Sequence, residues 1–161
     1  MITVHNLRDV ETETVRQWLD HIAANMRQED KNEAQAMSGL SPLDALVTSF
    51  NVSTHAYVIT GRDDKPCTIF GAAPHPLPGV GVVWMLGTDD MKTEAFQIAR
   101  QTSQYLEEVQ AAYPLIWNYI DPRNELSMRW LRWGGFKLLG DKPMGPAGLP
   151  FHIFARTKSC V

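Results

Sequence analysis

Apolar residues recur at helical intervals through the first third of the chain, at Val15, Trp18, Leu19, Ile22 and Met26. This spacing predicts one long helix over residues 10–36, after a short strand over residues 2–7. Ser41, Pro42 and Asp44 then form a helix start signal, with a capping hydroxyl, a proline at the first helical position and an acid where a capping box places one. A second, shorter helix is therefore expected from Ser41 onward.

The middle of the chain has the pattern of a sheet. Residues 55–60 and 67–73 are two apolar runs separated by a polar turn, which predicts a β-hairpin. The next run, residues 80–86, reads VGVVWML and contains no charge. A strand this apolar is expected to lie centrally in a sheet.

Alternation of helix and strand patterns continues to the end of the chain. The expected elements are a helix from Thr93 to about 112, a strand over 115–121, a helix over 124–133 capped by Asn124, a strand over 136–139, a loop over 140–150 and a last strand over 151–156. No linker divides the chain, so residues 1–161 are expected to form one domain. The order predicts an α/β (α+β) fold, with a mixed central sheet flanked by about four helices.

Composition excludes several classes of function. The net charge of −3 and the pI of about 5.9 argue against nucleic-acid binding. No apolar run approaches the roughly 20 residues of a membrane span, and the N-terminus has no signal-peptide pattern, so we expect a soluble, cytoplasmic protein. Cys67 and Cys160 form neither a disulfide framework nor a metal spacing, which predicts two reduced thiols and no metal.

Residues 124–136 carry the most specific motif, N-x-x-S-x-x-W-L-x-x-x-G-F. It resembles the end of the GCN5-related N-acetyltransferase (GNAT) fold, in which an Asn starts a helix and Gly-Phe closes it into the next strand; Asn124, Ser127, Gly135 and Phe136 match. The runs VVWMLGTDD, LIWNYIDPRNELSMRWLRWGGF and NMRQEDKNE are also similar to small phage-encoded GNAT-like proteins assigned to internal-virion or head-assembly roles.

The resemblance implies a binding site for acetyl-CoA or CoA. The backbone of the strand 80–86 would run beside the pantetheine arm, and the following loop and helix start would hold the pyrophosphate. The residues implied are Trp84, Met85, Leu86, Gly87, Thr88, Lys92, Thr93 and Asn124. The loop departs from the family's glycine-rich pattern, because Asp89 and Asp90 stand where an anionic phosphate should bind. A plain strand-to-helix turn is the alternative interpretation.

Catalytic residues are less clearly marked. Seven positions after Asn124, family members often carry a Tyr that protonates the leaving thiolate, but this chain has Leu131 there. Tyr119 on the preceding strand is the substitute proton donor, and His75 the candidate general base, with His55 as another. Each of these side chains has a purely structural alternative.

Three functions stay open. One is an N-acetyltransferase that moves an acetyl group from acetyl-CoA to an amine. The second is a catalytically degenerate phage virion or assembly protein, found in the host cytoplasm and the virion. The third is a factor that binds a host protein. A homo-oligomer is left open in each case.

Overall fold

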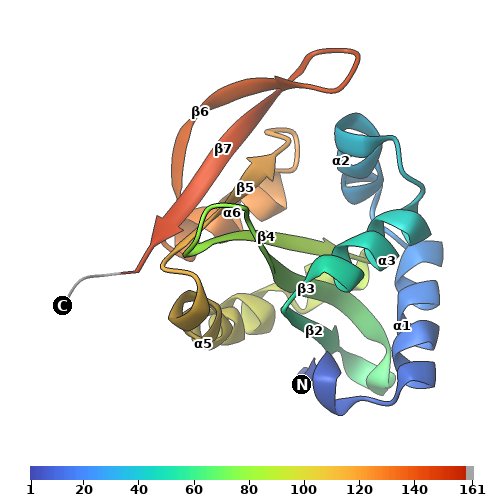
Figure 1. The fold of residues 1–161 in the computed structure, drawn as a ribbon. Helices are drawn as coiled ribbons and strands as arrows, with labels where there is room; N and C mark the ends of the chain where they lie inside the picture. Colours follow the sequence, from blue (N-terminus) through green and yellow to red (C-terminus); the bar gives the residue numbers. More distant parts are fainter. Residues whose placement is uncertain (159–161) are drawn as a thin grey trace.

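The computed structural model describes residues 1–158 and contains one seven-stranded sheet in the order β1-β2-β3-β4-β5-β7-β6 (Figure 1). The strands are β1 (Thr3–Asn6), β2 (His55–Thr60), β3 (Pro66–Pro74), β4 (Val80–Gly87), β5 (Leu115–Ile120), β6 (Lys137–Met144) and β7 (Leu149–Thr157). The helices are α1 (Thr12–Ala24), α2 (Gln28–Ser38), α3 (Pro42–Val52), α4 (Asp90–Thr93), α5 (Ala95–Ala112) and α6 (Glu125–Trp133), with two short 3-10 turns at Leu7–Asp9 and Arg62–Asp64. The predicted α/β class and mixed sheet are confirmed.

Antiparallel pairing joins every pair of neighbouring strands except β4 and β5, which run parallel. The predicted hairpin of β2 and β3 is confirmed, and the apolar run of β4 occupies the middle of the sheet. Pairing between β4 and β5 covers only three residue pairs, from Val80↔Leu115 to Val82↔Trp117. Beyond these pairs the two strands separate toward their C-terminal ends.

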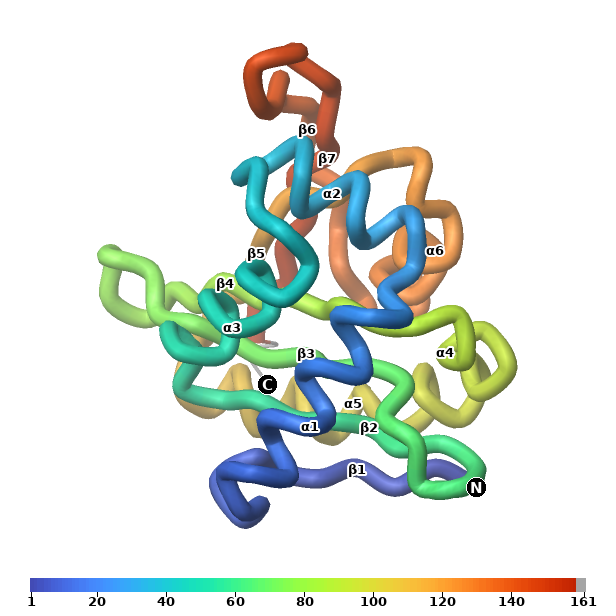
Figure 2. The backbone as a smooth tube through the Cα atoms, turned by 90° about the vertical axis from the view of Figure 1, so that its right-hand side faces the viewer, coloured from blue at the N-terminus to red at the C-terminus, as the bar shows by residue number. Residues whose placement is uncertain are grey.

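Helices cover both faces of the sheet (Figure 2). On one face α1 and α3 pack over β2 and β3 through a cluster centred on Ile22, Leu46 and Val58. On the other face α4 and α5 pack through Met91 and Ile98, and α5 and α6 enclose a third cluster with Ile116 and Phe154. The three clusters thus pack helices against the strands on both sides of β4.

The predicted long helix over residues 10–36 is wrong, because the chain breaks between α1 and α2. Met26 makes an isolated β-bridge with Thr88, and the Arg27 N–H donates to the Gly87 carbonyl oxygen at 2.9 Å. These bonds require an extended backbone, and Arg27 has φ −57 and ψ 146. Contacts with β4, which helical periodicity cannot reveal, therefore divide the helix.

Two expectations in the second half are also corrected. Thr93 does not cap the long helix, since it ends the short α4, and α5 begins one residue after Glu94. The predicted loop over residues 140–150 is instead the extension of β6 and β7 into a long hairpin. The tip of the hairpin reaches α2, where Gly145 lies against the Ala36 carbonyl group.

Six helices rather than about four flank the sheet in the described part of the chain. None of the helices in residues 1–158 combines the length and apolar character that a membrane crossing needs. Cys67 is a free, buried thiol whose pKa burial raises to about 11, and Cys160 lies outside the described residues.

Candidate functional site

The two parallel strands are held apart by a side chain. Asn118 Nδ2 donates to the Val83 carbonyl oxygen at 2.7 Å, and Asn118 Oδ1 accepts from the Tyr119 N–H at 2.7 Å. Asn118 is the residue directly after the last paired position of β5, and Val83 directly follows that of β4. The side-chain amide thus takes the place of a backbone bond, and the gap between the strands begins there.

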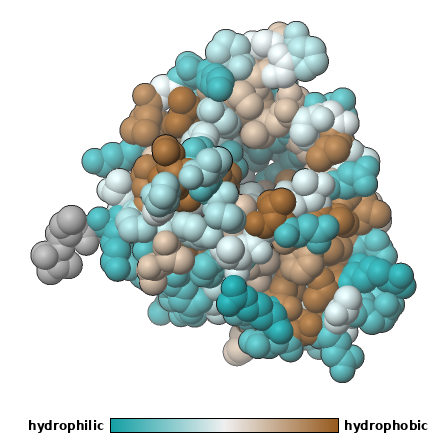
Figure 3. Space-filling model, in the orientation of Figure 1, coloured by the Kyte–Doolittle hydropathy of each residue, from teal (hydrophilic) through white to brown (hydrophobic). Residues whose placement is uncertain are grey.

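A cavity of about 410 Å³ fills the gap between the strands. Its lining is mostly apolar, with Trp84, Met85 and Leu86 from β4 on one side and Leu106 from α5 and Leu131 from α6 on another. A hollow near the centre of the molecule's face lies between apolar surfaces in Figure 3. A cavity of this size and character suits a small ligand that brings an apolar group between the strands.

Pairing of β4 with β5 ends at Val82, so the β4 backbone groups beyond it on this edge lie outside the sheet ladder. The Thr88 N–H donates to the Cys67 carbonyl oxygen of β3 at 2.8 Å, so the groups of its neighbour Gly87 point to the opposite edge. By the same alternation the Met85 N–H and C=O also face the gap. Met85 therefore offers a backbone donor directly at the cavity.

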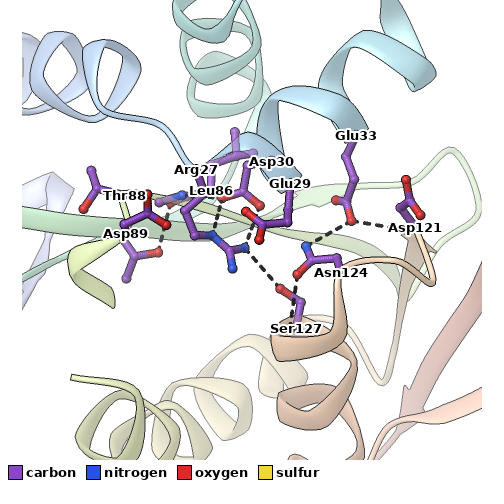
Figure 4. Close-up of polar contacts among 12 residues, drawn as sticks. Arg27, Glu29, Asp30, Glu33, Leu86, Thr88, Asp89, Asp121, Asn124 and Ser127 are labelled. Atoms are coloured by element: carbon purple, nitrogen blue, oxygen red, sulfur yellow. Dashed lines mark hydrogen bonds and ion pairs between the residues drawn. The ribbon is translucent and has the colours of Figure 1, made fainter. Parts of the chain in front are cut away.

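Helix α2 spans the gap on one face and bonds to both strand ends through two acids one turn apart. Asp30 Oδ2 accepts from the Gly87 N–H at 2.9 Å, at the end of β4. Glu33 Oε1 accepts from the Asp121 N–H at 3.2 Å and from Asn124 Nδ2 at 3.1 Å, just after β5 (Figure 4). The two carboxylates fix α2 above the opening between the strands.

Glu33 lines the cavity, and its carboxyl group has a raised pKa. Burial, followed by the negative charge of Asp30, raises the pKa of the Glu33 carboxyl to about 7, against the bonds from Asn124 and Asp121. Both hydrogen bonds go to Oε1. A carboxyl group with a pKa near neutrality in a cavity can accept or release a proton at physiological pH.

Arg27 closes the β4 end of the gap. Its Nε and Nη2 donate to the two Asp30 oxygens at 3.1 and 2.7 Å, and Nη2 also donates to Ser127 Oγ of α6 at 3.3 Å. Arg27 and Asp30 are each 1% exposed. Burial raises the pKa of the Asp30 carboxyl, and the Arg27 guanidinium and the Gly87 N–H oppose this rise.

The structure brings together only some of the residues that the sequence suggested for the cofactor. Trp84, Met85, Leu86 and Asn124 line the cavity. Gly87, Thr88, Lys92 and Thr93 lie beyond its β4 end and do not line it. Asn124 caps α6, as predicted, by accepting from the Ser127 N–H at 3.3 Å, and Lys92 pairs with Asp89 at 2.7 Å.

Of the two suggested catalytic residues, Tyr119 of β5 lines the cavity, whereas His75, which follows β3, does not. Tyr119 lines the cavity, and its hydroxyl accepts from Lys142 Nζ at 3.3 Å. His75 packs edge-on against Trp117, which packs edge-on against Tyr119, and His75 lies outside the lining. His55 also lies outside the lining, with its ring against Tyr113.

Sequence reasoning missed Glu33, Arg27 and Asp30. All three stand in a segment whose charge looks like an exposed helical face, and their partners are 57 to 100 residues away along the chain. The run Arg27–Glu33 holds three acids, one arginine and one lysine within one helix start. No local pattern marks which of these acids turn inward.

The fold matches known acetyltransferase structures over nearly its whole length. No protein-family model matches the chain, and no curated protein matches its sequence. A GCN5-related N-acetyltransferase from Kribbella flavida shares 14% identity, with a TM-score of 0.68 and 98% coverage of both chains. The ribosomal-protein-S5-alanine acetyltransferase from Vibrio fischeri shares 13% identity, with a TM-score of 0.64 and coverage of 97% of this chain and 92% of that one.

An aminoglycoside acetyltransferase solved in complex with coenzyme A is also similar, at 12% identity and a TM-score of 0.62, with 98% of this chain and 95% of that one covered. Structural similarity at identities this low establishes the fold alone. That fold is the one of the GCN5-related N-acetyltransferases. Among the described residues no group of three acidic, His or Cys side chains is placed to hold a metal ion.

Proposed function

We propose that the protein is an N-acyltransferase that moves an acetyl group from an acyl thioester such as acetyl-CoA to an amine. The observation that carries this proposal is the cavity between β4 and β5, which combines the backbone N–H of Met85 with a carboxyl group of raised pKa. The shared fold supports it, since the similar structures are named as acetyltransferases and one was solved with coenzyme A.

Glu33 is the proposed general base. An amine is protonated in neutral water and must lose a proton before its lone pair can attack a carbonyl carbon. A Glu33 carboxylate with a pKa near 7 can take that proton directly or through one water molecule. Proximity to the cavity favours Glu33 over His75 and His55, neither of which lines it.

The Met85 N–H is the proposed donor to the thioester carbonyl oxygen. It points into the gap at the cavity, and negative charge grows on that oxygen while the amine nitrogen bonds to the carbonyl carbon. The carbon–sulfur bond then breaks and the sulfur must gain a proton. Tyr119 lines the same cavity and is the proposed source of this proton, and its phenolate regains one from the nitrogen as the amide forms.

A second function keeps one specific observation in its favour. Both backbone groups of Gly87 are already bonded within the chain, and Asp89 and Asp90 follow at the loop where a pyrophosphate would lie. This arrangement favours a GNAT-fold protein without catalysis, for which the alternatives are a phage virion or assembly protein and a host-protein-binding factor. Trp133, which is 61% exposed on α6, is available to such a partner.

Release of thiol from acetyl-CoA or S-acetylpantetheine in the presence of a panel of amines tests the first function. We expect thiol release that depends on the amine, and a fall of about 10²- to 10⁴-fold in kcat/KM for Glu33→Gln. The profile of kcat/KM against pH should rise with a midpoint near 7, the pKa of Glu33. Absence of amine-dependent turnover with every donor and amine would favour the second function.

A further inference from the structure

The cleft between β4 and β5 widens toward the C-terminal ends of the two strands, and residues of the chain itself close it there. The strands are joined at 80–82 and 115–117, so a ligand chain that runs along the gap would leave past Gly87. Arg27 and Asp30 lie across that point, bonded to Gly87 of β4 and to Ser127 of α6 (Figure 4). In Figure 4 the guanidinium group lies between α2 above and α6 below.

The backbone bonds at this end are also in use. The Gly87 N–H is bonded to Asp30 Oδ2 and the Gly87 carbonyl oxygen accepts from the Arg27 N–H, each at 2.9 Å. A ligand amide or phosphate that bonded to these groups would have to displace a buried backbone bond or the charge-assisted bond of the Gly87 N–H to Asp30. By contrast, Met85, two residues earlier, faces the cavity itself.

The charges around this end disfavour an anion. Asp30 neutralises Arg27, and Asp89 pairs with Lys92 at 2.7 Å, while Glu29 lies 3.9 Å from the same ammonium group. Carboxylates therefore match or exceed the cations at the mouth of the cleft. A diphosphate would lose its hydration there and meet like charges in return.

The closure by Arg27 and Asp30 has a cost in stability. Within residues 1–158, Arg27 Nη1 is buried and has no hydrogen-bond partner. A buried polar group without a partner costs free energy, and a buried ion pair is often no more stabilising than an apolar pair of similar volume. Unlike an apolar plug, the charged pair also occupies the Gly87 N–H, a backbone donor that a phosphate could otherwise use.

We propose that Arg27 and Asp30 determine donor specificity by closing the β4 end of the cleft to a nucleotide diphosphate. The site then selects its donor by the thioester and the chain next to it, and gains no affinity from the adenosine diphosphate part of CoA. This inference rests on the proposed function, because it assumes that an acyl thioester enters the cavity.

Calorimetric binding of three probes to the wild-type protein tests the inference. They are acetyl-CoA, S-acetylpantetheine, which keeps the thioester and lacks the nucleotide, and 3′-phospho-ADP, which is the nucleotide alone. The expected result is equal affinity for the first two, within about threefold, and no binding of the third. A tenfold or greater preference for acetyl-CoA would overturn the inference, and so would binding of 3′-phospho-ADP.

A paired variant tests the closure directly. Arg27→Ala/Asp30→Ala removes both charges together, so no buried charge is left alone, and it frees the Gly87 N–H. We expect its affinity for acetyl-CoA to rise at least tenfold above its affinity for S-acetylpantetheine. The matched control is Glu13→Ala/Arg16→Ala, which removes an exposed pair of the same i,i+3 spacing on α1 and should behave as wild type.

The two failures can be told apart. If the wild type binds neither thioester, the proposed function fails, and the paired variant then decides the inference: a gain of acetyl-CoA binding sustains it and no gain overturns it. If the paired variant does not fold, 3′-phospho-ADP decides with the wild type alone: binding overturns the inference, and no binding sustains it.

Discussion

Asn118 and Val83 meet where β4 and β5 stop pairing, and the 2.7 Å bond from the side-chain amide to the carbonyl oxygen replaces the next bond of the ladder. This replacement of a backbone bond by a side-chain bond has a geometric consequence. A side chain is longer than a backbone N–H, so the strands separate while the carbonyl group stays satisfied. The cavity therefore begins at a position that one residue defines.

Replacing Asn118 tests whether the separation of β4 and β5 depends on its side chain. Asn118→Ala leaves the Val83 carbonyl oxygen without its donor, and we expect a loss of about 1–3 kcal/mol in the free energy of unfolding. Donor affinity should fall as well, because the walls of the cavity lose their spacing. Urea unfolding and calorimetry measure the two effects.

Asn51→Ala is the control, since Asn51 is exposed on α3. Its effect on stability should stay within about 0.5 kcal/mol. Equal effects of the two variants would show that the Asn118 amide is not what holds the strands apart.

Glu33 should make stability depend on pH in an unusual direction. Its pKa is about 7 in the folded protein against an ordinary value of 4.5, so the folded state binds more protons than the unfolded state between these values. The contribution of Glu33 to the free energy of unfolding is therefore fully present below about pH 4.5 and is lost as the pH rises through 7. We expect Glu33→Gln to gain on the order of 1–3 kcal/mol relative to wild type between pH 5 and pH 8.

The difference in unfolding free energy between variant and wild type, followed over that range by urea unfolding, isolates Glu33 from other titrating groups. Glu125→Gln, an exposed amide substitution on α6, serves as the control and should differ from wild type by no more than about 0.5 kcal/mol at either pH. A Glu33→Gln difference that does not change with pH would contradict a raised pKa.

Gly71 on β3 permits the close packing of Trp84 against the sheet. A Cβ atom at Gly71 would collide with the His55 carbonyl oxygen and lie 3.0 Å from the Trp84 ring, whose Nε1 donates to Ser53 Oγ at 2.8 Å. We expect Gly71→Ala to destabilise the protein by about 1–3 kcal/mol. The fluorescence of the tryptophans should change with it.

Gly61→Ala is the matched substitution, because its Cβ would meet only Glu94 side-chain atoms at 3.6 Å or more. Its effect on thermal unfolding should be small. If Gly71→Ala were equally mild, Trp84 would have room to move, and the β4 wall of the cavity would be looser than its contacts indicate.

Local signals in the sequence predicted the parts of the fold that local physics controls. Ser41 and Asn124 cap their helices, as the sequence indicated, because each side-chain oxygen accepts from a backbone N–H three residues on. The hairpin of β2 and β3 and the apolar β4 were visible for the same reason, since pattern and turn residues lie close together.

The site depends on distant contacts that periodicity does not contain. The helical pattern continues through Arg27, but backbone contacts of Met26 with Thr88 and of Arg27 with Gly87 break the helix, and side-chain bonds such as the one to Ser127 hold the buried guanidinium. Glu33 likewise becomes a candidate base only because Asp121 and Asn124 hold it over the cavity. Its raised pKa is a property of the assembled cleft.

The most direct test of the account asks whether an acyl donor occupies the cavity between β4 and β5. The measurement is thermal unfolding with and without saturating S-acetylpantetheine and acetyl-CoA, for wild type, Ala34→Phe, which fills the cavity from α2, and Ala111→Phe, an exposed control on α5. Donor at about 100 times its Kd adds roughly 2.7 kcal/mol, which raises the midpoint by several degrees. We predict this rise for wild type and Ala111→Phe and its loss in Ala34→Phe. No rise in the wild type, or an equal rise in Ala34→Phe, would contradict the claim that the cavity is the donor site.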